Sequence, residues 1–162
     1  MKITKEQKIA HDCLICGQDN PLGLHAHFYE MEDGSVVSLA TFKNEHQSYP
    51  NRVHGGMITA LLDETIGRVL WTKEPDVFAV TTEINVRFRK PVPLNEEIKC
   101  VATMESSNSR GFVASAKIID KTGQVLATGQ ATYFKVKNEA VDSSASEMFL
   151  PKDSKNLKNI EF

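Results

Sequence analysis

Six stretches of the chain have the apolar–polar alternation, or the Val-, Ile-, Thr- and Phe-rich composition, that is typical of β-strands. They span residues 23–32, 35–43, 77–90, 97–106, 112–121 and 125–136. Asp33-Gly34 separates the first two stretches, and this dipeptide between alternating runs predicts a tight hairpin. Residues 121–124 predict another tight turn. Strands joined by short turns pair antiparallel, so we expect an antiparallel sheet.

A different periodicity marks residues 55–72 as one long helix. Apolar residues and one threonine recur there every three or four positions, at Ile58, Leu61, Leu62, Thr65, Ile66 and Val69. Pro75 disfavours helical geometry in the residue before it and ends the helix. Residues 2–12 also have helical spacing and predict a short helix. One helix on one face of an antiparallel sheet gives an α+β domain.

The length of 162 residues corresponds to a single domain with a buried core. We place this domain at residues 1–137. Residues 138–162 are polar, with little apolar content, and predict a loose C-terminal tail. Local docking is expected within it at Met148, Phe149 and Leu150.

Charge and hydropathy argue against a nucleic-acid partner and a membrane span, and they predict the compartment. The formal net charge is −2 with both signs interspersed, so no basic field is present to hold a nucleic acid. The apolar stretches are far shorter than the roughly 18 to 20 residues of a membrane span. The first residues are charged and lack the apolar centre of a secretory signal, which predicts a cytoplasmic protein with reduced cysteines.

The cysteines are Cys13 and Cys16, in a C-x-x-C motif, and Cys100 in a predicted strand. A closed zinc site needs four ligands at close spacing; His11 and His25 lie nearby in sequence, but no second cysteine pair is present. A redox pair is expected at a helix N-terminus, whereas this motif precedes the glycines and proline of a loop. We therefore expect small buried residues in an N-terminal turn and no metal.

The long helix carries a second stripe beside its apolar face. Gly56, Ala60, Asp63 and Gly67 are three or four residues apart and share one line along the helix. Glycine inside a helix costs about 1 kcal/mol relative to alanine, so Gly67 indicates close approach of a backbone or a ligand. A carboxylate among small residues in a groove makes Asp63 a candidate catalytic group, with a solvent-facing aspartate as the alternative.

The neighbouring acid, Glu64, has a different expected environment. Arg68 lies four residues further along the chain and predicts an i, i+4 ion pair on an exposed helical face. We therefore interpret Glu64 as structural.

The start of the helix offers hydrogen-bond donors. Gly55 and Gly56 place backbone N–H groups without side chains at the positive end of the helix, which suits an oxyanion or a polarised carbonyl. His54 precedes them, but the chain has no G-x-S-x-G motif, and Asp63 lies well along the helix, which argues against a His-based triad. We assign His54 a role in shaping the turn before the helix.

Together these residues form a pattern that resembles the hotdog-fold acyl-CoA thioesterases of the phenylacetate-pathway type. The resemblance centres on VHGGMITALLDETIG and includes CLICGQDNPLGLHAHF, EHQSYPNRVHGG, INVRFRKPVPLNEEI and ATGQATYF, from about Cys13 to Phe134. It implies a long central helix wrapped by a curved antiparallel sheet. It also implies homodimers, alone or as dimers of dimers (homotetramers), that pair sheets edge to edge and form active sites at the dimer interface.

The resemblance further implies roles for single residues. Asp63 matches the catalytic carboxylate, acting as general base on water or as nucleophile, and the Gly55 N–H matches the oxyanion donor. Thr81 matches a hydroxyl residue that helps to place the water in some members. Ser48 stands where some relatives carry an amide, and the neighbouring Gln47 is a substitute for it.

The expected activity is hydrolysis of an acyl-CoA thioester to a free acid and CoA, with no cofactor beyond the CoA of the substrate. Cationic side chains near strand ends attract the CoA phosphates. The expected substrate contacts are Gln47, Ser48, His54, Gly56, Arg89, Lys90 and Arg110. The alternatives are a non-catalytic acyl-CoA-binding module and a hotdog dehydratase, which pairs a histidine with a carboxylate; His54 lies too close to the helix start for that arrangement.

Overall fold

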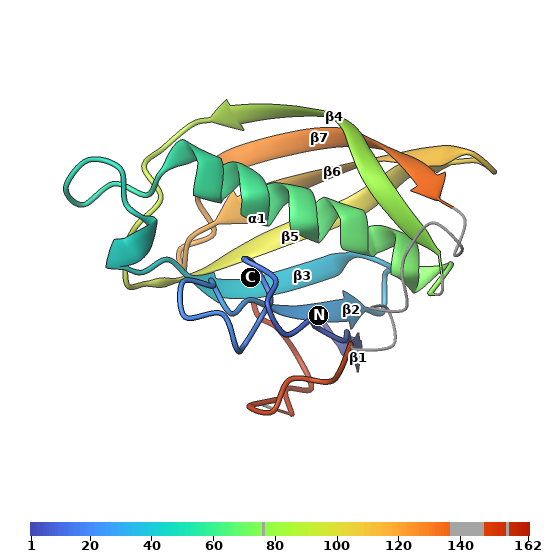
Figure 1. Cartoon of the computed structure of the whole chain (residues 1–162), viewed down its shortest axis with the longest axis horizontal. Coiled ribbons are helices and arrows are strands. Elements are labelled where there is room, and N and C mark those ends of the chain that lie inside the picture. Colours follow the sequence, from blue (N-terminus) through green and yellow to red (C-terminus); the bar gives the residue numbers. More distant parts are fainter. Residues whose placement is uncertain (76, 137–147, 155) are drawn as a thin grey trace.

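The long helix lies across the inner face of one curved sheet (Figure 1). The computed structural model describes residues 1–75, 77–136, 148–154 and 156–162. Helix α1 covers Gly55–Arg68 and continues as the 3-10 helix η2, Val69–Thr72; a further 3-10 turn, η1, covers Asn44–His46. The strands are β1 (Ile3–Glu6), β2 (His27–Met31), β3 (Val36–Thr41), β4 (Phe78–Phe88), β5 (Glu97–Ser107), β6 (Gly111–Ile119) and β7 (Val125–Val136). The predicted α+β class is confirmed.

All paired strands are antiparallel, in the order β1-β2-β3-β5-β6-β7-β4. The chain leaves the sheet after β3, forms α1, and returns as β4 at the far edge. Strands β5, β6 and β7 then fill the gap between β3 and β4. The predicted turn at Asp33-Gly34 joins β2 to β3, with Gly34 in the left-handed region at φ +80°. This topology places both β4 and β7 over the same stretch of α1.

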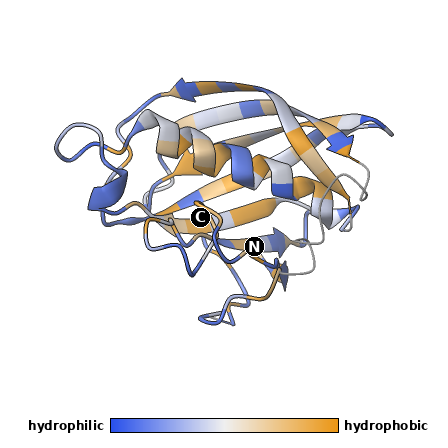
Figure 2. Cartoon of the chain, in the orientation of Figure 1, coloured by the Kyte–Doolittle hydropathy of each residue, from blue (hydrophilic) through white to orange (hydrophobic). Residues whose placement is uncertain are grey.

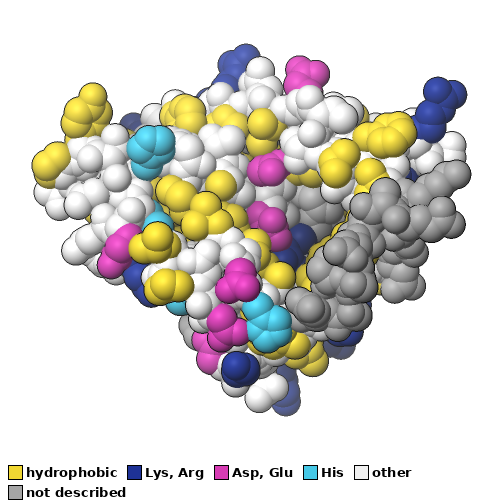
Figure 3. All heavy atoms as spheres, viewed as in Figure 1, with side chains coloured by type: hydrophobic (Ala, Val, Ile, Leu, Met, Phe, Trp, Pro, Cys, Tyr) yellow, Lys and Arg dark blue, Asp and Glu magenta, His cyan; other side chains and the backbone are white. Residues whose placement is uncertain are grey.

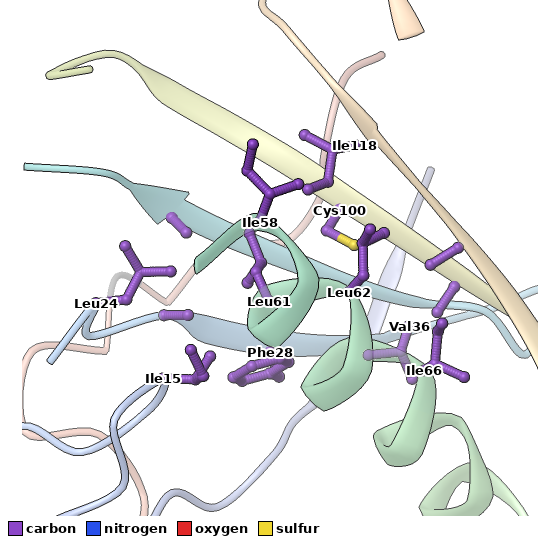
Figure 4. Packing of buried hydrophobic residues seen from close by; sticks show 14 of the residues in the cluster. Ile15, Leu24, Phe28, Val36, Ile58, Leu61, Leu62, Ile66, Cys100 and Ile118 are labelled. Atoms are coloured by element: carbon purple, nitrogen blue, oxygen red, sulfur yellow. The ribbon is translucent and has the colours of Figure 1, made fainter. Parts of the chain in front are cut away.

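The core lies between α1 and the sheet. Leu61, Leu62 and Ile66 are fully buried and point toward sheet side chains such as Val36 and Cys100 (Figure 4). Figure 2 shows apolar residues in α1 and in the strands behind it, and hydrophilic residues in the loops. Burying one such side chain contributes about 1.5–3 kcal/mol, so this face fixes the rotation of the helix about its axis.

Residues 2–12 do not form the predicted short helix. Residues 3–6 are strand β1, which pairs with β2, and the Gln7 N–H donates to the Phe28 carbonyl at 2.9 Å. Ile9 exchanges backbone hydrogen bonds of 2.8 and 3.0 Å with Phe149. The helical spacing misleads here because segments that are distant in sequence supply the hydrogen bonds.

The described residues of the C-terminal tail pack against the domain. The expected docking of Phe149 is confirmed, and Ile160 is buried with Tyr29 and other residues of β2 and β3 in a second apolar cluster. The Met1 ammonium donates to the Ile160 carbonyl at 2.7 Å, so the two chain ends lie side by side (Figure 1). These residues are not loose, in contrast to the expectation. Residues 137–147, with the expected domain boundary, lie outside the described residues.

Within the described ranges, no helix has both the length and the apolar character that crossing a bilayer requires.

Candidate active site

Asp63 lies about two turns into α1 and faces β4 and β7. Its Oδ1 accepts hydrogen bonds from the Thr81 hydroxyl at 2.8 Å and from the Tyr133 hydroxyl at 2.7 Å. The Tyr133 hydroxyl also lies 2.6 Å from the Asp63 backbone carbonyl oxygen, so its one proton is shared between two acceptors. No residue that the structure describes donates to Oδ2. That oxygen is therefore the one that can act on a water or a substrate.

The sheet register brings the two hydroxyl donors together. Thr81 and Tyr133 are direct partners in the β4–β7 pairing, and the register shifts between Thr81 and Glu83. Such a bulge re-aims the side chains beside it. The next hydroxyl, on Thr82, bonds instead to the Thr132 carbonyl at 3.0 Å. The structure thus places Thr81, which the family resemblance had singled out, against Asp63.

Tyr133 is the site residue that the sequence analysis missed. Its ring stacks on Phe112 with centroids 4.7 Å apart, and a Cβ added at Gly67 would lie 3.3 Å from its Cε1. The glycine therefore makes room for an aromatic ring, rather than for the backbone or ligand that we expected. Burial and the hydrogen bond to Asp63 raise the pKa of Tyr133 above its usual value, so the phenol stays a donor at neutral pH.

A signal for Tyr133 is present in the sequence. Gly129, Ala131 and Tyr133 alternate with exposed residues along β7 and are all buried. A period of two places them on the face toward the helix, with the aromatic residue last. The alternation gives the face, but the partner of the hydroxyl depends on the strand register.

A cavity of about 460 Å³ lies beside Asp63. Such a volume is typical of small-molecule sites. Its polar lining includes Glu64, Arg68, Thr81 and Tyr133. Its apolar wall comes from η2, the first half of β4 and the residue before β4: Leu70, Trp71, Val77, Phe78, Ala79 and Val80. On this face of the molecule, acidic side chains lie between apolar patches (Figure 3). The Asp63 carboxylate thus lies beside a space that has both polar and apolar walls.

The start of α1 has a different arrangement. His54 is the N-cap, and its Nδ1 accepts the Gly56 N–H at 2.9 Å. The expected turn-shaping role of His54 agrees with this contact, which also occupies the Gly56 N–H. The Gly55 N–H has no hydrogen-bond partner among the described residues. Of the two predicted backbone donors, the N–H groups of Gly55 and Gly56, the Gly55 N–H is therefore the free one.

The free donor and the carboxylate are too far apart to act together within one chain. Gly55 and Asp63 are eight positions apart on one helix, which at about 1.5 Å per residue separates them by about 12 Å along the axis. A reacting carbonyl must lie within about 3–3.5 Å of both its oxyanion donor and the attacking group. Gly55 and Asp63 of the same chain therefore cannot both reach one reacting carbonyl.

The other expected substrate contacts do not gather at Asp63. None of Gln47, Ser48, Arg89, Lys90 and Arg110 lines the cavity beside it. The loop with Gln47 and Ser48 folds back on the helix start, through a bridge from Gln47 to Val53. Arg89 lines a hollow on the opposite face of the sheet. Arg110 lies in the β5–β6 turn, where its N–H bonds to the Asn108 side chain.

The ion pair predicted between Glu64 and Arg68 is confirmed, with Nη2 of Arg68 2.8 Å from Oε1 of Glu64. The exposed face predicted for it was wrong, because the Arg68 side chain is only 4% exposed. Its guanidinium lies 3.9 Å from the centre of the Phe28 ring and donates to the Lys8 carbonyl at 2.8 Å. The N-terminal segment and β2 thus cover the Arg68 side chain, while Glu64 remains 30% exposed.

Residues 51–127 match the family model of the thioesterase superfamily. The rat acyl-coenzyme A thioesterase THEM4 is 26% identical over 113 residues, which cover 70% of this chain and 47% of the rat protein, so the chain spans about half the length of this curated relative. Among solved structures, protein RHA08564, a thioesterase superfamily protein, has a TM-score of 0.70 at 25% identity, over 76% of this chain and 60% of that one. The E. coli PaaI protein from the phenylacetic acid degradation operon has a TM-score of 0.64 at 16% identity, over 70% and 81%.

Proposed function

We propose that this chain, a hotdog-fold protein whose residues 51–127 match the thioesterase superfamily, hydrolyses an acyl-CoA thioester to a free acid and CoA. One observation carries the proposal: the Asp63 carboxylate is held by two hydroxyl donors beside a cavity that has an apolar wall. The name of the rat relative, an acyl-CoA thioesterase, supports the same class of substrate.

In this proposal Asp63 supplies the attack on the thioester carbonyl. As a general base, it takes a proton from water while the water oxygen bonds to the carbonyl carbon. As a nucleophile, its own oxygen forms an anhydride with the acyl group, which water then hydrolyses. In both routes CoA leaves as a thiolate and takes up a proton. Thr81 and Tyr133 keep the carboxylate in one orientation.

The developing oxyanion is stabilised at a helix N-terminus. A single backbone donor of this kind contributes on the order of 10²-fold or more to kcat, and general base catalysis a similar factor. Because Gly55 and Asp63 of one chain are separated along the helix, we propose that Gly55 of one subunit acts with Asp63 of another. The protein would then work as a homodimer or a dimer of dimers.

The test is hydrolysis of acyl-CoAs that carry aliphatic chains of increasing length or an aryl acyl group. The measured signal is the release of the CoA thiol. Asp63→Asn should lower kcat by about 10² or more. Asp120→Asn, the same change in the exposed β6–β7 turn, is the matched control and should retain full activity.

Two outcomes would contradict the proposal. Stoichiometric acyl-CoA binding without turnover by the wild type would indicate a binding module. Dehydration of hydroxyacyl-CoAs, abolished by His54→Ala, would indicate a dehydratase. The structure gives this second outcome little support, because the His54 ring caps the helix.

A further inference from the structure

The C-x-x-C motif forms a compact turn with both thiols beside α1. Sγ of Cys13 accepts the N–H groups of Ile15 and Cys16, each at 3.3 Å, and the Gly17 N–H donates to the Cys13 carbonyl at 2.8 Å. A Cβ at Gly17 would lie 2.5 Å from the Cys13 backbone, so only glycine allows the turn to close. Backbone N–H groups aimed at a sulfur stabilise a thiolate, the form that binds metals.

Helix α1 places a carboxylate against this turn. Sγ of Cys13, Sγ of Cys16 and a carboxylate oxygen of Glu64 all lie within 4.8 Å of one another. Around a tetrahedral zinc ion, with bonds of about 2.0–2.3 Å, two ligand atoms are about 3.5–3.8 Å apart. Small rotations of the three side chains would bring them to that spacing.

The charges of these groups balance around a divalent cation. Two thiolates and a carboxylate around a divalent ion leave one negative charge, and the buried guanidinium of Arg68 balances it. Both contacts of Arg68 with Glu64, at 2.8 and 2.9 Å, use Oε1. Oε2 is thus left for a metal, while Arg68 orients the carboxylate from behind, as outer-sphere partners of metal ligands do.

We propose that Cys13, Cys16 and Glu64 bind a thiophilic divalent metal ion of the zinc class, with water as the fourth ligand. The ion would link the N-terminal turn to the turn of α1 that carries Asp63 and Glu64. The half-buried Cys13 gives the ion a path from solvent. The proposal replaces the expectation of no metal, which rested on the absence of a second cysteine pair; the missing ligand comes from the helix.

The test begins with protein purified under reducing conditions without chelator. Elemental analysis should find about one zinc per chain. After removal of the metal, titration with Co²⁺ should produce the thiolate-to-cobalt charge-transfer band and the visible bands of a tetrahedral site. Zn²⁺ should displace the Co²⁺ and raise the unfolding temperature, because a ligand that binds only the native state stabilises it.

Variants separate this site from unspecific binding. Cys13→Ser with Cys16→Ser should abolish the charge-transfer band, and Glu64→Gln should weaken Zn²⁺ binding about tenfold or more. Cys100→Ser, in the buried β5 strand, is the matched control and should bind Co²⁺ normally. Cys13→Ser alone, at the half-buried position, provides the same test if the double variant does not fold.

Three results would overturn the proposal. The first is a reduced, folded wild type that binds neither Zn²⁺ nor Co²⁺ at one per chain. The second is binding that persists without Cys13 and Cys16. The third is a Cys13–Cys16 disulfide in the protein as isolated, seen as a loss of two hydrogens in its mass, which would make the motif a redox pair instead.

Discussion

Tyr133 directs its hydroxyl at two oxygens of Asp63, the carboxylate Oδ1 at 2.7 Å and the backbone carbonyl at 2.6 Å. The bond to the carbonyl fixes the phenol relative to the helix, and the bond to Oδ1 fixes the carboxylate relative to the phenol. Thr81 adds a second donor to the same oxygen. In the proposed mechanism the reacting carboxylate must be held to within about 0.5 Å, and β4 and β7 would supply that restraint.

Removal of the Tyr133 hydroxyl should therefore slow turnover without loosening substrate binding. Tyr133→Phe keeps the ring stacked on Phe112 and removes a hydrogen bond to a charged group, which is worth about 1.5–3 kcal/mol. We expect kcat to fall about tenfold or more while KM changes little. Steady-state kinetics, which gives kcat and KM separately, tests this prediction. Tyr29→Phe, a buried tyrosine in the second apolar cluster, is the control; an equal effect of both changes would show a general loss of stability instead.

We expect Gly67 to affect turnover through its contact with the Tyr133 ring. Alanine favours a helix by about 1 kcal/mol over glycine, but its methyl group would lie 3.3 Å from the Tyr133 ring. We expect Gly67→Ala to leave thermal stability nearly unchanged and to lower kcat several-fold, because the ring and its hydroxyl are displaced. A double-mutant cycle with Tyr133→Phe tests this mechanism. Additive effects on log kcat would show that Gly67 acts independently of the hydroxyl.

The sequence identifies the helix side of this site better than the sheet side. Asp63 and Gly67 stand out because a carboxylate and a glycine interrupt a regular helical pattern. The stripe shows that α1 leaves space, but not which side chain fills it. Tyr133 fills it because β7 pairs with β4 in one register, and the bulge after Thr81 cannot be located by local pattern. Thr81 was therefore predicted from the family resemblance, whereas the alternation along β7 gives the face on which Tyr133 lies but not its hydroxyl partner.

Long-range contacts also explain the misassigned N-terminal segment. The spacing of Ile3 and Ile9 fits a helix, but β2 and Phe149 offer backbone partners on either side. The burial of Arg68 has the same origin, because Phe28 and Lys8 approach it from segments distant in sequence. Spacing along one helix correctly predicts that Glu64 and Arg68 meet, and contains no information on what covers them.

Glu64 should contribute to stability more than to turnover. Glu64→Gln leaves the buried Arg68 without its carboxylate, although the Lys8 carbonyl and the Phe28 ring remain. Removing one partner of a fully buried ion pair costs about 3–5 kcal/mol; Glu64 is 30% exposed, so we expect a smaller loss, of about 1–3 kcal/mol. Denaturant unfolding measures the loss. Below the unfolding transition, kcat should stay near the wild-type value while Asp63→Asn lowers it; the reverse order would assign the catalytic role to Glu64.

The last prediction concerns the assembly of the site from two chains. Strand β4 is at the edge of the sheet, and two of its large apolar side chains are solvent-exposed, Val80 at 51% and Phe88 at 57%. Unpaired edges of this kind are paired or covered in stable proteins. Light scattering at micromolar concentration should show a dimer or a tetramer, and a stable monomer would exclude a shared site.

Gly55→Pro and Asp63→Asn should each inactivate the protein alone. If Gly55 and Asp63 act across an interface, the two variants should restore activity when their chains are combined in one dimer. Gly55→Pro removes the N–H donor and adds a Cβ at an ordinary contact distance, 3.4 Å, from Cζ of Phe88. Proline is favoured at the first helical position, and His54, at φ −64° and ψ 133°, already has the backbone that precedes a proline. Each dimer of one variant has two defective sites, whereas a mixed dimer has one intact site. Random mixing makes half of the dimers mixed, so co-expressed variants should recover about a quarter of wild-type activity. If the mixed dimers, isolated by two affinity tags, are as inactive as the parents, each site is built within a single chain.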